Sequence, residues 1–173
     1  MTFAKIAGLT IAIAAATAAT STADATVRTS VSHPTNYCQT ALPVFDGNVR
    51  KRPVSVQNEG SSNAFVTCSF GIDVVDSQAS QGILGADLYF HSDAPGSVTC
   101  TGVAGWNGVQ GTAVKTLALT GGGQTAAPMS FTTADFPDGQ MGTGLFSVSC
   151  NLAPGVGIDD TYVGFDDGEA APV

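Results

Sequence analysis

Apolar and polar residues alternate along several runs of this chain, and this period of two is the feature that most limits its fold. In the run 83–91, every second residue is apolar: Leu84, Ala86, Leu88 and Phe90. The runs 64–71, 97–103 and 143–152 show the same alternation. Successive side chains of a β-strand point to opposite faces, so each run predicts a strand with one buried and one wet face.

Turn-forming clusters of Gly, Asp, Asn and Pro separate the alternating runs. We expect strands near 27–32, 43–49, 53–58, 64–71, 83–91, 97–103, 112–119, 128–132, 143–152 and 158–165. About ten short strands without a convincing helix predict an all-β fold, either an antiparallel two-sheet β-sandwich or a closed barrel. Immunoglobulin-like and jelly-roll-like connectivities both fit this pattern.

The first 25 residues have the pattern of a secretory signal peptide. A cationic start at Lys5 precedes the uncharged apolar run 6–19, and Ala23-Asp24-Ala25 has the small-x-small form of a cleavage site. The run is shorter than the roughly 20 residues of a membrane span. We therefore expect a signal helix over 1–25, one β-sandwich domain over 26–165 and a flexible acidic tail over 166–173. The product is expected to be secreted or periplasmic and free of the membrane.

Four cysteines, Cys38, Cys68, Cys100 and Cys150, predict two disulfides, because export exposes the chain to an oxidising compartment. The chain has no C-x-x-C pair, and only two histidines could supplement the thiols, so neither a metal centre nor a cofactor is expected. The preferred pairing is sequential, Cys38 with Cys68 and Cys100 with Cys150. Such bridges join either two layers or two neighbouring strands.

The charge balance excludes two classes of partner. The chain has 6 Lys+Arg against 14 Asp+Glu and a formal net charge of −8. Affinity for nucleic acids and for anionic membranes comes mainly from cationic side chains, so neither partner is expected.

The residues do not predict a catalytic site. His91 precedes Ser92-Asp93, but no nucleophile signature accompanies it, and His33 before Pro34 is interpreted as a linker residue. The acids are interpreted mainly as turn residues that bond their own backbone: Asp93, Asp135, Asp138, Asp159, Asp160, Asp166 and Asp167. No D-x-D-x-D-G spacing occurs, and whether calcium binds these acidic turns stays open.

Two features are candidates for contact with a ligand or partner. The cluster Arg50, Lys51 and Arg52 has the charge to hold an anionic group, although a charged strand edge that prevents aggregation is the favoured interpretation. Trp106 is the only tryptophan and lies in a glycine-rich turn. It is interpreted either as a residue that stacks on a sugar or partner, or as a cover over the end of the core.

Four segments around the cysteines carry a family resemblance: 36–39, 66–70, 98–101 and 148–155. They resemble a group of uncharacterised secreted bacterial proteins that look like single β-sandwich domains of unassigned function. That group has a C-x-L-P-P-G-like segment near its end, and Ala153 replaces its first proline here. The resemblance implies the fold and no active-site residue. A weaker likeness is to periplasmic pilins, but the acidic C-terminus lacks the apolar alternation of their assembly strand.

The sequence therefore predicts a secreted, non-catalytic β-sandwich that acts as a surface binding or structural module. Its expected partner is a protein or a glycan, with the identity of the ligand and the oligomeric state left open. The alternatives are a subunit of an extracellular filament or adhesin, and a small secreted hydrolase.

Overall fold

The computed structural model describes residues 25–72, 82–106, 108–125 and 128–170. The expected signal helix, apart from Ala25, and residues 171–173 of the expected tail lie outside this described part. Within it, no helix is long and apolar enough to cross a membrane.

The described chain is built almost entirely from strands. They are β1 (Ala25–Ser32), β2 (Cys38–Thr40), β3 (Val49–Arg52), β4 (Ser55–Asn58), β5 (Ala64–Gly71), β6 (Gly82–Ser92), β7 (Gly96–Trp106), β8 (Val109–Leu119), β9 (Gly123–Gln124), β10 (Met129–Thr132), β11 (Leu145–Leu152) and β12 (Val156–Ala170). The helical segments of the described chain are short 3-10 helices: η1 (Pro34–Asn36), η2 (Pro43–Phe45), η3 (Thr133–Asp135) and η4 (Pro137–Thr143).

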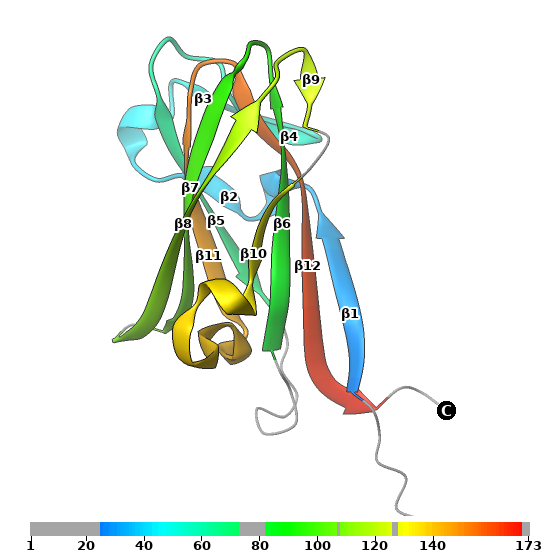
Figure 1. The fold of residues 1–173 in the computed structure, drawn as a ribbon. Coiled ribbons are helices and arrows are strands. Elements are labelled where there is room, and N and C mark those ends of the chain that lie inside the picture. Colours follow the sequence, from blue (N-terminus) through cyan, green and yellow to red (C-terminus); the bar gives the residue numbers. More distant parts are fainter. Residues whose placement is uncertain (1–24, 73–81, 107, 126–127, 171–173) are drawn as a thin grey trace, which may run out of the picture.

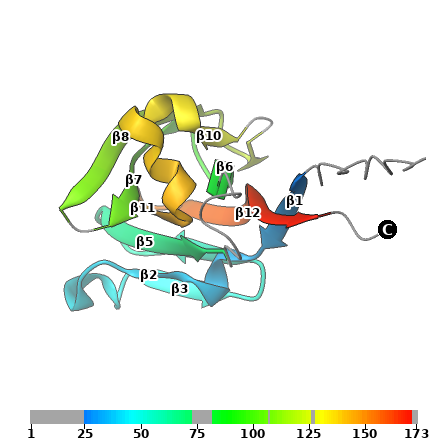
Figure 2. The same cartoon turned by 90° about the horizontal axis from the view of Figure 1, so that it is seen from below.

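The strands form two antiparallel sheets that face each other (Figures 1 and 2). Sheet A has the order β10-β6-β12-β4-β3, with β1 also paired to β12 and β9 to β6. Sheet B has the order β2-β5-β11-β7-β8. The predicted all-β, two-sheet antiparallel fold is therefore confirmed. The long strand β12 is central to sheet A, because its first part pairs with β4 and its later part with β1.

The core lies between the sheets and follows the predicted alternation on β5 and β11. Val66, Cys68 and Phe70 are buried on β5, and their partners on β11 are buried with them. Four phenylalanines form the aromatic part of this core: Phe70, Phe131, Phe136 and Phe146. The Phe146 ring centroid lies 5.7, 5.6 and 5.8 Å from those of Phe70, Phe131 and Phe136.

Both disulfides lie within sheet B. Cys38 is bonded to Cys68 and Cys100 to Cys150, and in each case the two residues are directly opposite on adjacent strands. The bridges therefore join neighbouring strands, β2 with β5 and β7 with β11, and do not connect the two layers.

A lysine links the free edge of sheet B to sheet A. Lys115 on β8 donates from Nζ to the carbonyl oxygen of Ser130 on β10 at 2.7 Å. The same Nζ lies 2.7 Å from Oδ2 of Asp135 and 5.5 Å from the centroid of the Phe131 ring. These contacts fix β10 at the side of the sandwich.

Two strand predictions are wrong in detail. Residues 43–49 do not form a strand, because Pro43 begins η2 and a turn follows before β3 starts at Val49.

On β6, Ile83 is fully buried and Leu84 is only half-buried, the reverse of the predicted pattern. The register of β6 against β12 shifts here, since Phe165 pairs with Ile83 and Gly164 with Gly85. The extra residue of this bulge moves Leu84 out of the core.

The expected acidic tail does not begin at residue 166. β12 continues to Ala170, because β1 pairs with it over that length, with Val27 opposite Asp166 and Ala25 opposite Ala170. Asp166 itself is buried, with an exposed fraction of 3%. Charge suggested fraying, but the backbone hydrogen bonds of an antiparallel partner keep the segment in the sheet.

Candidate ligand-binding surface on sheet A

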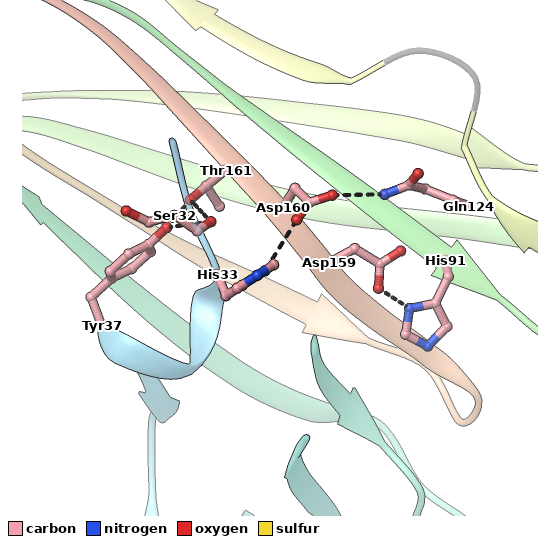
Figure 3. A network of polar contacts seen from close by, with 8 residues as sticks. All are labelled: Ser32, His33, Tyr37, His91, Gln124, Asp159, Asp160 and Thr161. Atoms are coloured by element: carbon pink, nitrogen blue, oxygen red, sulfur yellow. Dashed lines mark hydrogen bonds and ion pairs between the residues drawn. The ribbon is translucent and has the colours of Figure 1, made fainter. Parts of the chain in front are cut away.

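A bulge in the middle of β12 places three polar residues side by side. Ile158 pairs with Phe90 and Thr161 with Leu88, so β12 has one residue more than β6 over this stretch. Bulges commonly redirect side chains. Asp159, Asp160 and Thr161 each contact polar groups on different elements, as Figure 3 shows. The sequence interpretation of the two acids as turn residues is therefore wrong.

Asp159 is paired with His91 of β6. Its Oδ1 lies 2.5 Å from Nδ1 of the imidazole, and the two side chains are 17% and 18% exposed. The hydrogen bond to Asp159 raises the pKa of His91 above its usual value, although partial burial opposes it. Gly157, opposite His91, makes room for this ring, because a Cβ built there would overlap the imidazole.

The His91–Asp159 pair predicts a pH-dependent part of the stability. A histidine whose pKa is higher in the folded than in the unfolded state stabilises the fold fully below its unfolded value of 6.5. That contribution is lost as the pH rises through the folded pKa. We expect Asp159→Asn to lower the free energy of unfolding by about 1.5 kcal/mol at about pH 5.5, and by clearly less at about pH 9. Urea unfolding at both pH values measures this difference.

The neighbouring acid supplies the control. Asp160 forms a more exposed pair with His33, whose side chain is 52% exposed, so Asp160→Asn should have a smaller effect at both pH values. An equal loss at the two pH values in Asp159→Asn would show that the ion pair is not the cause.

Asp160 joins the start of η1 to β9. Its Oδ1 lies 3.3 Å from Nδ1 of His33, and its Oδ2 accepts a hydrogen bond from Nε2 of Gln124 at 3.2 Å. His33 is thus an ion-pair partner, a role that its interpretation as a linker residue did not include.

Thr161 returns to the inner side of the sheet and joins a cluster of hydroxyl groups. Its hydroxyl and that of Tyr37 both donate to the carbonyl oxygen of Ser32, each at 3.1 Å, and the two hydroxyls also contact each other. Burial raises the pKa of Tyr37 to about 12, while its hydrogen bond to Ser32 opposes the shift. The phenol is therefore protonated at neutral pH.

The outer side of sheet A carries an aromatic pair beside an open hollow. Tyr89 of β6 and Tyr162 of β12 meet edge to face, with ring centroids 5.6 Å apart. Asp87 lies directly opposite Tyr162 on one side and Ser130 on the other. A hollow of about 420 Å³ lies here. We call the following residues the tyrosine face: Thr29, Asp87, Tyr89, Ser130, Thr132 and Tyr162.

The tyrosine face was missed by the sequence analysis. Tyr89 and Tyr162 lie 73 positions apart in the sequence, and only the pairing of β6 with β12 brings their rings together. The sequence signal that could have indicated this surface is that Asp87, Tyr89 and His91 share the polar side of one alternating run. Which strand lies beside that run is not a local property of the sequence.

The two contact features proposed from the sequence lie elsewhere. Arg50, Lys51 and Arg52 are on β3, the outermost strand of sheet A at one end of the sandwich (Figure 1). Arg52 donates from Nε to Glu59 at 2.8 Å. Trp106 ends β7 at the opposite end, with an exposed fraction of 54%, so it is not a cover over the core. The structure does not bring these features together.

The groups near His91 are engaged in contacts of other kinds. The hydroxyl of Ser92 donates to the carbonyl oxygen of Ala94 at 2.6 Å. Among the described residues, no group of three or more His, Cys, Asp or Glu side chains is arranged to hold a metal ion.

No protein-family model and no curated protein sequence matches the chain. Several solved structures resemble it at low identity. TmCBM61 in complex with β-1,4-galactotriose has 11% identity and a TM-score of 0.37, over 80% of this chain and 84% of that one. The Podospora anserina GH26-CBM35 β-(1,4)-mannanase has 9% identity and a TM-score of 0.40, over 84% of this chain and 28% of that one.

A third similar structure is the family 11 carbohydrate-binding module from Clostridium thermocellum, in complex with a β-1,3-1,4-mixed-linked tetrasaccharide. It has 10% identity and a TM-score of 0.37, over 79% of this chain and 87% of that one. The sequence identity and the TM-score are low for all three structures. The proposed function therefore depends on the residues of this chain alone.

Proposed function

We propose that this protein is a non-catalytic binding domain that holds a neutral glycan on the tyrosine face. The observation that supports this most directly is the Tyr89–Tyr162 pair beside the Asp87 carboxylate, where Tyr162 and Asp87 line an open hollow of about 420 Å³. The two disulfides favour a location outside the cytoplasm, because such bridges persist in oxidising compartments.

Sugar rings match the chemistry of this face. A pyranose has an apolar C–H side and a rim of hydroxyl groups, and the negative face of a tyrosine ring attracts C–H groups. The carboxylate of Asp87 accepts hydrogen bonds from hydroxyls and is a stronger acceptor than a neutral group. The hydroxyl of Ser130 acts as both donor and acceptor, whereas that of Thr132 donates to Oδ2 of Asp135 at 3.2 Å and can still accept.

Charge favours a neutral ligand over an anionic one. Asp87, Asp159 and Asp160 all lie on or beside the outer side of sheet A, and the chain has a net charge of −8. Acidic groups repel uronic acids and phosphorylated sugars. The hollow is open to solvent and large enough for a ligand that lies along the surface.

Removal of one ring tests the proposal. We expect Tyr162→Ala to weaken binding of a neutral oligosaccharide by about tenfold or more, because an aromatic anchor is lost from the centre of the site. Retention on gels that contain neutral polysaccharides identifies the glycan, and calorimetry with an oligosaccharide from that polymer measures the loss.

The matched control is Phe65→Ala. Phe65 is an aromatic residue of β5 that is 44% exposed, but it belongs to sheet B. This variant should bind as the parent does. Retention of the Tyr162→Ala variant equal to that of the parent, or no retention of the parent on any neutral polymer, would contradict the proposal.

Trp106 supports a second proposed contact, with either a glycan or a partner protein. More than half of this large aromatic side chain is exposed, which is typical of residues that anchor a partner. We expect Trp106→Ala, or a variant with Arg50, Lys51 and Arg52 replaced by glutamate, to weaken capture of that partner. If both variants bind glycans and extracellular proteins as the parent does, these contacts are wrong.

A further inference from the structure

A second hollow lies on the other side of the β1–β12 pair, where the two sheets separate. It has a volume of about 200 Å³ and lies between β12 and β1 of sheet A and β5 of sheet B. This volume is below the roughly 300–1,000 Å³ of pockets that hold drug-sized ligands, so the space suits one small ring and not a chain. We call it the inter-sheet pocket.

The pocket and the tyrosine face use alternate residues of the same two strands. On β1, Thr29 lines the outer hollow and Ser30 lines the inter-sheet pocket. On β12, Tyr162 faces outward, whereas Thr161 and Val163 line the pocket. Because successive side chains of a strand point to opposite faces, these are two separate sites that share one wall.

The walls of the pocket differ in polarity. Hydroxyl groups come from Ser30, Ser32, Tyr37 and Thr161. Apolar side chains come from Phe70, Ile72 and Val163, and the Tyr37 and Phe70 ring centroids are 5.0 Å apart. None of the described lining residues carries a charge at neutral pH.

The hydroxyl groups have capacity left for a ligand. Tyr37 and Thr161 bond to the carbonyl oxygen of Ser32 at 3.1 Å and also contact each other, so the capacity for a ligand comes from the serine hydroxyls (Figure 3). Ser30 and Ser32 lie two positions apart on β1, so both hydroxyls are on the pocket side of the strand, and each both donates and accepts. A purely apolar ligand would leave these groups without partners, and none of the described lining residues offers a counter-charge to a charged ligand.

We propose that the inter-sheet pocket binds a single neutral pyranose ring, with the apolar side of the ring against Phe70 and Val163 and its hydroxyls toward Ser30 and Ser32. The ring is either a free monosaccharide or the end unit of a glycan. This proposal does not depend on the tyrosine face, because it uses different side chains.

The test is titration of the oxidised full-length protein, labelled with ¹⁵N, with neutral methyl pyranosides of gluco, galacto and manno configuration. We expect one of them to shift the amide signals of Ser30 and Ser32. Ser30→Leu fills the pocket and should weaken this binding by about tenfold or more. Ser32→Leu, on the same side of β1, should act in the same way. The melting temperature of each variant shows that it is folded.

Thr29→Leu is the matched comparison, because it places the same side chain on the other face of the same strand. It should leave pyranoside binding at the pocket unchanged and weaken oligosaccharide binding at the tyrosine face. An oligosaccharide that shifts the pocket signals through its end unit identifies the glycan as the source of the ring; a response to the methyl pyranoside alone identifies the free sugar.

The two proposals fail in different ways. Pyranoside shifts confined to Asp87 and Tyr162, equal binding by Ser30→Leu and the parent, or no shift with any of the three sugars would overturn the pocket proposal. Pyranoside binding in the pocket without oligosaccharide binding that depends on Tyr162 would overturn the tyrosine-face proposal alone.

Discussion

Replacing Cys100 and Cys150 together by alanine is expected to lower the free energy of unfolding by about 4 kcal/mol. The bridge closes a sequence separation of 50 residues, so its loss returns much conformational freedom to the unfolded chain. Both cysteines are fully buried at the centre of sheet B, where β7 pairs with β11. Urea unfolding followed by the fluorescence of Trp106, the only tryptophan, measures the change.

The Cys38–Cys68 bridge provides the internal comparison. It closes a shorter separation of 30 residues, so its double replacement by alanine should cost about 0.5 kcal/mol less in the chain-entropy model. It ties down β2, the outermost strand of sheet B. A loss below about 1 kcal/mol for the Cys100–Cys150 variant would show that the unfolded chain is already restricted by other means.

Phe146→Ala is expected to cost 3–5 kcal/mol, or about 4 kcal/mol at the middle of that range. Its side chain is 3% exposed and contacts three other phenylalanine rings. These are Phe70 on β5 of sheet B, Phe131 on β10 of sheet A and Phe136, the residue before η4. Removal of the ring deletes its contacts with the facing sheet and leaves a cavity. The strands cannot easily close this cavity, because hydrogen bonds to their neighbours hold them in place. Thermal and urea unfolding measure the loss.

Phe65→Ala is the control for this substitution as well. Its ring is 44% exposed on the outer side of sheet B, so the expected loss is about 1 kcal/mol or less. Similar losses in the two variants would mean that the four-phenylalanine cluster does not stabilise the core as the packing indicates. Because Phe131 contacts Phe146 and also lines the hollow of the tyrosine face, we expect Phe146→Ala to weaken glycan binding too.

Alternation alone determined much of the fold. The period of two marked the inner faces of β5 and β11, including Cys68 and Cys150, and the near-absence of helical periodicity excluded helical layers. These are local signals, because the direction of a side chain on a strand depends only on its position along that strand. The number of cysteines likewise predicted two disulfides without knowledge of the fold.

Tertiary structure decided which strands are neighbours, and with that the candidate sites. The pairing of β6 with β12 brings Tyr89 to Tyr162, and the bulge after Ile158 joins Asp159 to His91. The pairing of β1 with β12 separates the tyrosine face from the inter-sheet pocket and holds the acidic segment up to Ala170 in the sheet. Pairing and register between strands far apart in sequence depend on the whole packed structure, and one extra residue in a strand reverses which face its side chains occupy.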